Sequence, residues 1–242
     1  MLAVRRWGRV AWTLLTGFVV ESIVFGLAVF PAAVFWEWHL AWQFPGEWAR
    51  IVVLAMAFVP AYLLFAVGLM LFSAVAMRLL RWRTPADAVM RIRDLEWPLL
   101  DWVRYTALTH VTRVFAGTFL RATPVWTMYL RLNGARVGRD VLVNTLGASD
   151  HNLLELGSRS VIGSDVHIAG HTVEGGFVKT CAVRVGRNVT IGVGSVVMMG
   201  AEIGDGCDVG ALSFVPKHAR LEGGLLYAGI PAHRIGSRQA AP

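Results

Sequence analysis

Aliphatic residues recur at every sixth position through the C-terminal half of the chain. The repeat runs from Val185 to Leu221 without a break, and an earlier block from Leu156 to Ile168 has the same spacing. Glycine mostly follows each aliphatic residue. Neither the 3.6-residue period of a helix nor the two-residue period of a strand produces this spacing. A hexapeptide β-helix does, because three hexads complete a triangular coil with the aliphatic side chains inside and glycine permitting the turn at each corner.

Two interruptions of this repeat are where we expect function. Seventeen residues separate Ile168 from Val185, which is not a multiple of six, so residues 170–184 are predicted to leave the coil as a loop. A second slip in the register carries residues 149–152. Binding and catalytic residues concentrate on such excursions from a rigid scaffold.

The N-terminal part of the chain is too apolar for an ordinary soluble domain, in a sequence that is 55% hydrophobic overall. Residues 10–35 and 51–77 each exceed the roughly 20 residues that a membrane-spanning helix needs. Four tryptophans between residues 36 and 48 suit an interfacial aromatic belt around a short turn. The sequence therefore predicts a transmembrane hairpin within residues 1–83.

The distribution of arginine predicts the orientation of this hairpin. Three arginines precede the first apolar run and three follow the second, whereas the loop between the runs holds only Arg50. Positive charge favours the cytoplasmic side, so both termini and the β-helix are expected in the cytoplasm. Membrane-surface electrostatics also accounts for the net charge of +7 without a nucleic-acid partner.

Residues 84–133 are expected to form amphipathic helices on the membrane surface. Thr84, Pro85 and Asp87 are an N-cap candidate, a proline at the first helical position and an acid in the first turn, so a helix is predicted to begin there. Pro98 and Pro124 are expected to break the run. The β-helix is predicted to occupy residues 134–236, in about five coils, and residues 237–242 form a tail.

The repeat, together with the closing segment Tyr227-Ala228-Gly229-Ile230-Pro231-Ala232, resembles the hexapeptide-repeat acyltransferases. Residues 117–138, 153–157 and 171–174 resemble more specifically the membrane-bound C-terminal region of nonribosomal-peptide-synthetase-like proteins of the polylysine synthetase type. The resemblance implies a left-handed parallel β-helix, assembled as a homotrimer with sites between adjacent prisms. It implies transfer of an acyl or aminoacyl group from a thioester to an amine or hydroxyl.

Candidate catalytic residues lie on the two interruptions. His171 occupies the position that resembles the catalytic histidine of the superfamily, and histidine suits a general base near neutral pH. Glu174, three residues on, is expected to hold the imidazole as a triad carboxylate does, with a structural role equally open. Asp150, His151 and Asn152 are expected to line the acceptor side of the same cleft, or else to form a polar turn.

The donor is expected to be a cosubstrate, with no permanently bound cofactor. Both coenzyme A thioesters and thioesters on a separate acyl or peptidyl carrier protein remain open, because no adenylation or carrier domain is expected within residues 1–242. A phosphopantetheine arm is expected to lie along the coils at the corner residues Gly192, Gly210 and Ala211. Lys217 resembles the cofactor-side lysine of the superfamily.

Two other functional classes compete with this interpretation. A zinc hydratase of the γ-carbonic-anhydrase type has the same β-helix and would use His151, His167 and His171, although His167 and His171 are four residues apart and that family spaces its later histidines five apart. A non-enzymatic membrane scaffold is the other alternative, and the His171 loop argues against it. Cys181 and Cys207 are too few for a disulfide framework or a usual zinc site, so free thiols are expected.

Overall fold

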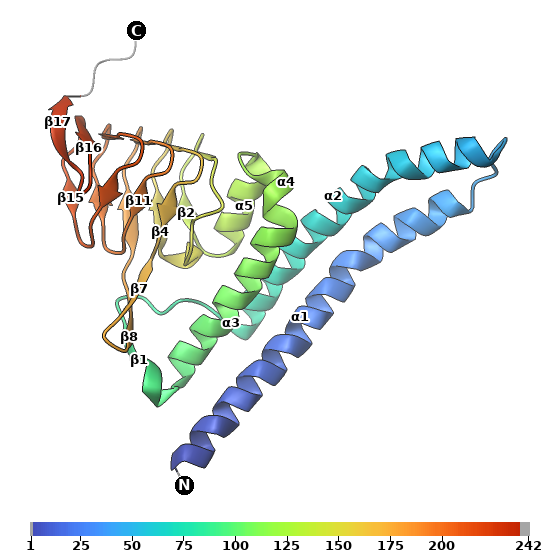
Figure 1. Cartoon of the computed structure of the whole chain (residues 1–242), viewed down its shortest axis with the longest axis horizontal. Helices are drawn as coiled ribbons and strands as arrows, with labels where there is room; N and C mark the ends of the chain where they lie inside the picture. The colour runs from blue at the N-terminus through green and yellow to red at the C-terminus, as the bar shows by residue number, and fades with distance from the viewer. Residues whose placement is uncertain (1, 238–242) are drawn as a thin grey trace.

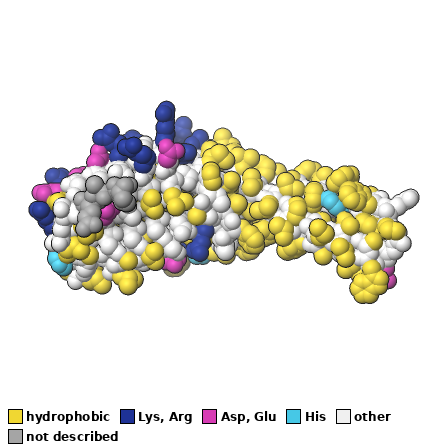
Figure 2. Space-filling view, turned by 90° about the horizontal axis from the view of Figure 1, so that it is seen from above, with side chains coloured by type: hydrophobic (Ala, Val, Ile, Leu, Met, Phe, Trp, Pro, Cys, Tyr) yellow, Lys and Arg dark blue, Asp and Glu magenta, His cyan; other side chains and the backbone are white. Residues whose placement is uncertain are grey.

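The computed structural model describes residues 2–237, with side chains from residue 5 onward. A long antiparallel helical hairpin, α1 (Leu2–Leu40) and α2 (Glu47–Leu80), is followed by a compact coiled β-structure (Figure 1). Only 11% and 22% of the most apolar stretches of these helices are buried within the chain. Within the described residues, these two helices are long and apolar enough to cross a membrane. The apolar surface of the hairpin is continuous in Figure 2.

The segment after the hairpin differs from its prediction, because no helix begins at Thr84. Residues 84–88 form an irregular linker in which Asp87 has a φ of 47°, and the chain then enters a strand, β1 (Val89–Arg91). That strand pairs with β8 (Phe177–Thr180) far along the sequence, and the Thr84 hydroxyl bonds to Asp150 rather than capping a helix. Tertiary partners therefore override the local helix signal.

Helices between the linker and the coils cover the start of the β-structure. They are the 3₁₀ turn η1 (Ile92–Asp94), α3 (Trp97–Thr112), the π-helical turn η2 (Arg113–Gly117), α4 (Thr118–Leu120) and α5 (Pro124–Leu132). Pro98 and Pro124 stand in the first turns of α3 and α5, where the missing N–H costs nothing, so they begin helices instead of breaking one. α3 packs against both helices of the hairpin, and α5 packs on the first strands of the coil.

The remaining strands form three sheets whose successive members lie one coil apart. The first sheet holds β2 (Arg136–Val137), β4 (Leu154–Leu156), β9 (Val183–Val185), β12 (Glu202–Ile203) and β15 (Arg220–Leu221). The second sheet holds β3 (Leu142–Val143), β5 (Val161–Ile162), β10 (Thr190–Ile191), β13 (Asp208–Val209) and β16 (Leu225–Ala228). The third sheet holds β6 (His167–Ile168), β11 (Val196–Val197) and β14 (Phe214–Val215). Pairing within these sets is parallel, and from β9 onward the chain visits the three sheets in turn. The six-residue repeat thus builds a three-sided prism.

One antiparallel strand, β17 (His233–Ser237), closes the last coil beside β16. The predicted tail lies outside the described residues apart from Ser237.

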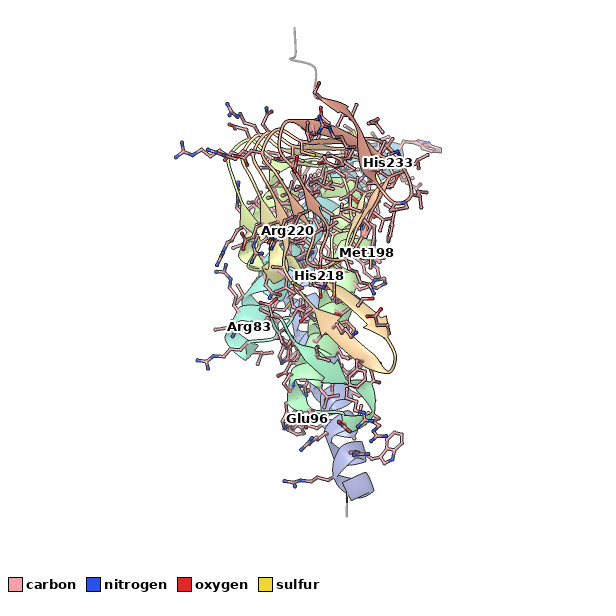
Figure 3. All side chains as sticks on the ribbon, turned by 90° about the vertical axis from the view of Figure 1, so that its left-hand side faces the viewer. Arg83, Glu96, Met198, His218, Arg220 and His233 are labelled. Atoms are coloured by element: carbon pink, nitrogen blue, oxygen red, sulfur yellow. The ribbon has the colours of Figure 1, made fainter. Side chains whose placement is uncertain are left out.

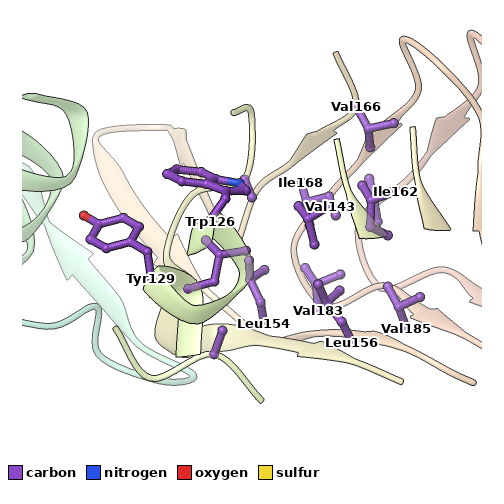
Figure 4. Close-up of a cluster of buried hydrophobic side chains, with 14 of the residues drawn as sticks. Trp126, Tyr129, Val143, Leu154, Leu156, Ile162, Val166, Ile168, Val183 and Val185 are labelled. Carbon is purple, nitrogen blue, oxygen red and sulfur yellow. The ribbon is translucent and has the colours of Figure 1, made fainter. Parts of the chain in front are cut away.

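The aliphatic repeat fills the interior of the prism, as predicted. Ile191, Val197 and Val215 are completely buried, and the other members from Val185 to Leu221 are at most 7% exposed. At the start of the prism this core continues into aromatic side chains of α5, Trp126 and Tyr129 (Figure 4). The coiled part and the helices therefore share one hydrophobic core.

Glycine serves the prism differently from the prediction. A Cβ at Gly192 would lie 2.4 Å from the backbone nitrogen of Ala211, so glycine there permits neighbouring coils to stack closely. The left-handed backbone of the corners falls two residues later in each hexad, for example at Gly194 (φ 68°) and Leu212 (φ 56°). Corner positions therefore tolerate residues other than glycine, whereas the position after each aliphatic residue is limited by space.

Truncation of one repeat side chain should destabilise the whole coil. Ile191→Ala is expected to lower the free energy of unfolding by about 2–5 kcal/mol, because it removes fully buried methyl groups and leaves a cavity. Chemical unfolding of the full chain in detergent, followed by circular dichroism, measures the change. The matched control is Val193→Ala, whose side chain is 53% exposed, and it should change the free energy by less than about 0.5 kcal/mol. Equal losses in the two variants would contradict the assignment of Ile191 to the core.

Candidate active site

The predicted excursion from the prism is a β-hairpin that carries His171 at its base. Its strands, β7 (His171–Glu174) and β8, turn at Gly175 and Gly176, both with positive φ. β1 adds a third strand, and the Thr180 hydroxyl donates to the carbonyl of Pro85 at 2.6 Å. The hairpin is therefore attached to the linker that leaves the apolar helices, as well as to the prism (Figure 1).

The imidazole of His171 is paired with the carboxylate of Asp150. Nδ1 of His171 lies 2.5 Å from Oδ2 of Asp150. The Asp150 side chain is 1% exposed, whereas that of His171 is 24% exposed. Asp150 adopts a left-handed backbone conformation at the second interruption of the repeat, φ 52°, which turns its side chain toward the hairpin one coil on.

Three neutral donors complete the surroundings of the Asp150 carboxylate. Oδ1 accepts hydrogen bonds from the Thr84 hydroxyl at 2.7 Å and from the Trp102 indole at 3.2 Å, and Oδ2 accepts one from the Ser149 hydroxyl at 2.9 Å. Trp102 also packs its ring edge-on against the His171 imidazole, with centroids 5.1 Å apart. The carboxylate is thus fully hydrogen-bonded despite its burial.

These contacts shift the pKa values of both Asp150 and His171. Burial raises the pKa of Asp150, but hydrogen bonds from His171, Thr84 and Ser149 outweigh it, so this pKa lies below its usual value. The hydrogen bond to Asp150 raises the pKa of His171 above its usual value, against the opposing effect of burial. An ionised Asp150 holds the proton of the neutral imidazole on Nδ1, which leaves the lone pair on Nε2. The pair has the arrangement of a general base and its orienting carboxylate.

The predicted contact between His171 and Glu174 is not formed. Glu174 is exposed and binds two lysines, with Lys179 Nζ at 2.9 Å from Oε1 and Lys217 on Oε2. Ion pairing with Lys217 and Lys179 lowers the pKa of Glu174 to about 2. Alternate residues of a strand point to opposite faces, so side chains three positions apart on β7 diverge. The expectation that Glu174 holds the imidazole was wrong, and Asp150 occupies that place.

Replacement of Glu174 should therefore leave the chemistry of the His171 pair intact. Glu174→Gln is expected to change kcat of any transfer that depends on His171 by less than about threefold, because an exposed ion pair contributes little. Steady-state kinetics with the full chain measures this. A loss as large as that of a His171 variant would show that Glu174 acts in catalysis after all.

Two of the residues predicted to line the acceptor side serve the framework. His151 is 3% exposed, packs between the rings of Tyr105 and Tyr129, and has its pKa lowered to about 4 by burial. Asn152 brackets the linker, accepting from the Thr84 amide at 3.2 Å and donating to its carbonyl at 2.8 Å. The expectation of an acceptor-lining role is wrong for His151, because the fold buries its ring.

The residues predicted to contact a donor lie along the coils. Gly192 and Ala211 stack in adjacent coils, and Gly210 packs near Ala228. Lys217 reaches the hairpin through Glu174. The corner that contains Met198 and His218 lies beside the hairpin in Figure 3.

The γ-type zinc arrangement finds no support within the described residues of one chain. They contain no group of three or more histidine, cysteine or acidic side chains able to hold a metal ion. Nε2 of His151 is also buried, 3.2 Å from the Ala148 carbonyl.

Thr84 and Trp102 are site residues that the sequence did not single out for chemistry, and Ser149 entered only as part of the interruption at residues 149–152. Thr84 had the pattern of a helix cap, and Trp102 that of an amphipathic helix. Their shared contact with Asp150 joins residues 48 and 66 positions away along the chain. No local pattern marks such a contact.

Comparison with known proteins bears out the resemblance. No protein-family model matches the chain. The chain is 27% identical to Delta-poly-L-ornithine synthetase of Acinetobacter baumannii over 176 residues, 71% of this chain and 13% of that protein. It is 30% identical to UDP-3-O-acylglucosamine N-acyltransferase of Delftia acidovorans over 115 residues, 43% of this chain and 34% of the relative. The chain thus spans about an eighth and a third of the length of these curated relatives.

Several solved structures with similar coordinates are acetyltransferases. The match to a hexapeptide-repeat acetyltransferase from Vibrio cholerae covers 47% of this chain and 80% of the acetyltransferase chain, with a TM-score of 0.39 and 15% identity. The match to a maltose O-acetyltransferase from Clostridium difficile 630 covers 57% of this chain and 88% of that enzyme's chain, with a TM-score of 0.43 and 21% identity. By sequence, the chain is similar to an N-acyltransferase over 43% of its length and to one segment of a poly-ornithine synthetase over 71% of its length.

Proposed function

We propose that this chain is a membrane-anchored acyltransferase in which His171, oriented by Asp150, is the general base. The observation that carries the proposal is the 2.5 Å contact between His171 Nδ1 and a buried carboxylate, which leaves Nε2 as the basic atom. A base of this kind removes the proton from an attacking nucleophile as its bond to the acyl carbon forms. The thioester carbon–sulfur bond then breaks, and the proton held by the His171 imidazole passes to the leaving thiolate, which departs as a thiol.

The acceptor is proposed to be an amine. One relative is an N-acyltransferase, which supports a nitrogen acceptor. An ammonium group has no lone pair, so the acceptor must first lose one proton to water. A base with a raised pKa then suits removal of a second proton as the nitrogen bonds to the acyl carbon. A hydroxyl acceptor would need the same proton transfer.

The donor is proposed to be a thioester, on coenzyme A or on a carrier protein. Its phosphopantetheine arm would run across the coils past Gly192, Gly210 and Ala211, with Lys217 beside it. These residues lie in stacked coils, and Lys217 contacts the hairpin that carries His171. A left-handed prism assembled as a trimer would place a second copy against these residues.

A direct assay tests the function. The full chain in detergent is incubated with acetyl-coenzyme A and a panel of amines, and thiol release is followed together with the mass of the acylated product. A carrier-protein thioester provides the second donor. Transfer by the unaltered chain that is lost in a His171 variant is the expected result. Stoichiometric zinc with carbon dioxide hydration, and no transfer from either donor, would favour the hydratase instead.

The hairpin is proposed to span the membrane with the prism on the cytoplasmic side. A cysteine introduced at Gly46, between α1 and α2, is expected to react with a membrane-impermeant maleimide in intact cells. A cysteine at Glu222, on an exposed part of the prism, should react only after permeabilisation. Both are made in a background in which Cys181 and Cys207 are replaced by alanine. The reverse pattern of labelling would contradict this topology.

A further inference from the structure

A large cavity among the described residues does not have His171 in its lining, and no step of the proposed function uses it. Its volume is about 1080 Å³, and it opens where the apolar hairpin meets the rest of the molecule. The end of α2, the linker, the first turn of α3 and the end of α5 form its walls. Cavities of this size hold small-molecule ligands in other proteins.

Three arginines give the cavity a positive charge. Arg78, Arg81 and Arg83 line it, and all three are exposed residues. The acid in the wall, Asp101, is occupied by Arg104, at 2.8 Å from a guanidinium that is itself 6% exposed. Among the described residues, no ion pair joins the three arginines to an acid.

Within the described part of the chain, Arg78 hydrogen-bonds to backbone carbonyls and not to an acid. It donates from Nε to the carbonyl of Leu132 at 2.6 Å, which satisfies the C-terminal end of α5. The carbonyls that Arg78 binds are neutral, so its positive charge remains in the wall of the cavity. At the end of α2, the Trp82 amide donates to the carbonyl of Met77 at 2.9 Å.

Apolar side chains also line the cavity. They are Met77 of α2, Trp97 of α3 and Leu132 of α5. Arg78 is the first charged residue after the apolar run of α2, so the cavity lies at the level where that run ends. In Figure 2, basic side chains gather along one edge of the coiled part, up to the start of the apolar surface.

We propose that this cavity binds the phosphate group of an anionic ligand. Guanidinium groups match phosphate oxygens with paired N–H donors, and three of them face one space that holds no free acid. The ligand would lie beside the catalytic pair, because Thr84 lines the cavity and donates its hydroxyl to Asp150. The phosphate comes either from a membrane lipid headgroup or from a soluble phosphate compound, and the two sources differ in what else they place against Met77 and Trp97.

Binding to the full chain in detergent tests the proposal with two probes. Inorganic pyrophosphate, titrated by calorimetry, represents soluble phosphate. Phosphatidylglycerol, compared with phosphatidylcholine by native mass spectrometry, represents an anionic headgroup against a zwitterionic one. The binding variant is Arg81→Gln with Arg83→Gln, because Arg78 also supports α5. The matched control is Arg184→Gln with Arg220→Gln, which removes the same charge from the prism surface.

Loss of about tenfold or more in affinity for either probe is expected in the binding variant, with little change in the control. Selective retention of phosphatidylglycerol, displaced by pyrophosphate, would assign the site to a lipid headgroup. Binding of pyrophosphate without lipid selectivity would assign it to a soluble phosphate. The proposal is overturned if the unaltered chain binds neither probe, or if the control variant loses as much affinity as the binding variant. These readouts need no turnover, so absence of acyl transfer would refute the proposed function and leave the phosphate site standing.

Discussion

Replacing His171 with alanine is expected to lower kcat of acyl transfer by about 10²–10⁴-fold, the usual contribution of a positioned general base. Binding of donor and acceptor should change much less, because the imidazole acts on the proton in the transition state. The experiment measures kcat and KM separately with the full chain in detergent. His171→Gln keeps the size and polarity of the side chain but supplies no base, so it should lose as much.

The control for this prediction is Glu174→Gln on the same strand. It tests whether any change in the hairpin impairs transfer, and it should remain active because Glu174 binds lysines rather than the imidazole. Transfer at the unaltered rate by His171→Ala would remove the general base from the mechanism and favour a scaffold. Circular dichroism of each variant establishes that the prism is intact.

The second large effect is expected from Asp150→Asn. The amide can still accept hydrogen bonds from Thr84 and Trp102 through its oxygen, but it presents N–H groups to His171 Nδ1. The imidazole proton would then move to Nε2, and the basic atom would point away from the acceptor. A loss of about 10²–10⁴-fold in kcat is expected, comparable to loss of the base itself.

The pH profile separates this effect from a simple loss of structure. A general base works in its deprotonated form, so kcat/KM rises with pH through the pKa of His171 in the free enzyme. Asp150 raises that pKa, and residual activity in Asp150→Asn should therefore persist to lower pH than in the unaltered chain. An unchanged inflection of the pH profile in Asp150→Asn would contradict the pairing of Asp150 with His171.

Thr84→Val removes one of several hydrogen bonds to the Asp150 carboxylate. It should lower kcat by only about tenfold.

Features with a local period could be predicted from the sequence. Ile191 and the other aliphatic residues at six-residue spacing specify the interior of the prism, because each coil repeats the same environment. From Val185 onward, the residue stacked in the next coil is eighteen positions further along the chain. The two apolar runs likewise predicted α1 and α2 through length and composition alone. The seventeen-residue gap before Val185 predicted that a segment carrying His171 leaves the coil, which it does as a hairpin.

The partner of that histidine depended on tertiary structure. Glu174 is three residues from His171 in sequence, yet the strand turns it to the opposite face, whereas Asp150 is brought to Nδ1 by the stacking of one coil on another. Thr84 shows the same limit, since its helix-capping pattern is overruled by a carboxylate 66 residues away. Periodic side-chain burial can be predicted from positions that are close together in the sequence, but a hydrogen-bonded site joins separate elements. Its geometry exists only once the linker, α3 and the coils have packed together.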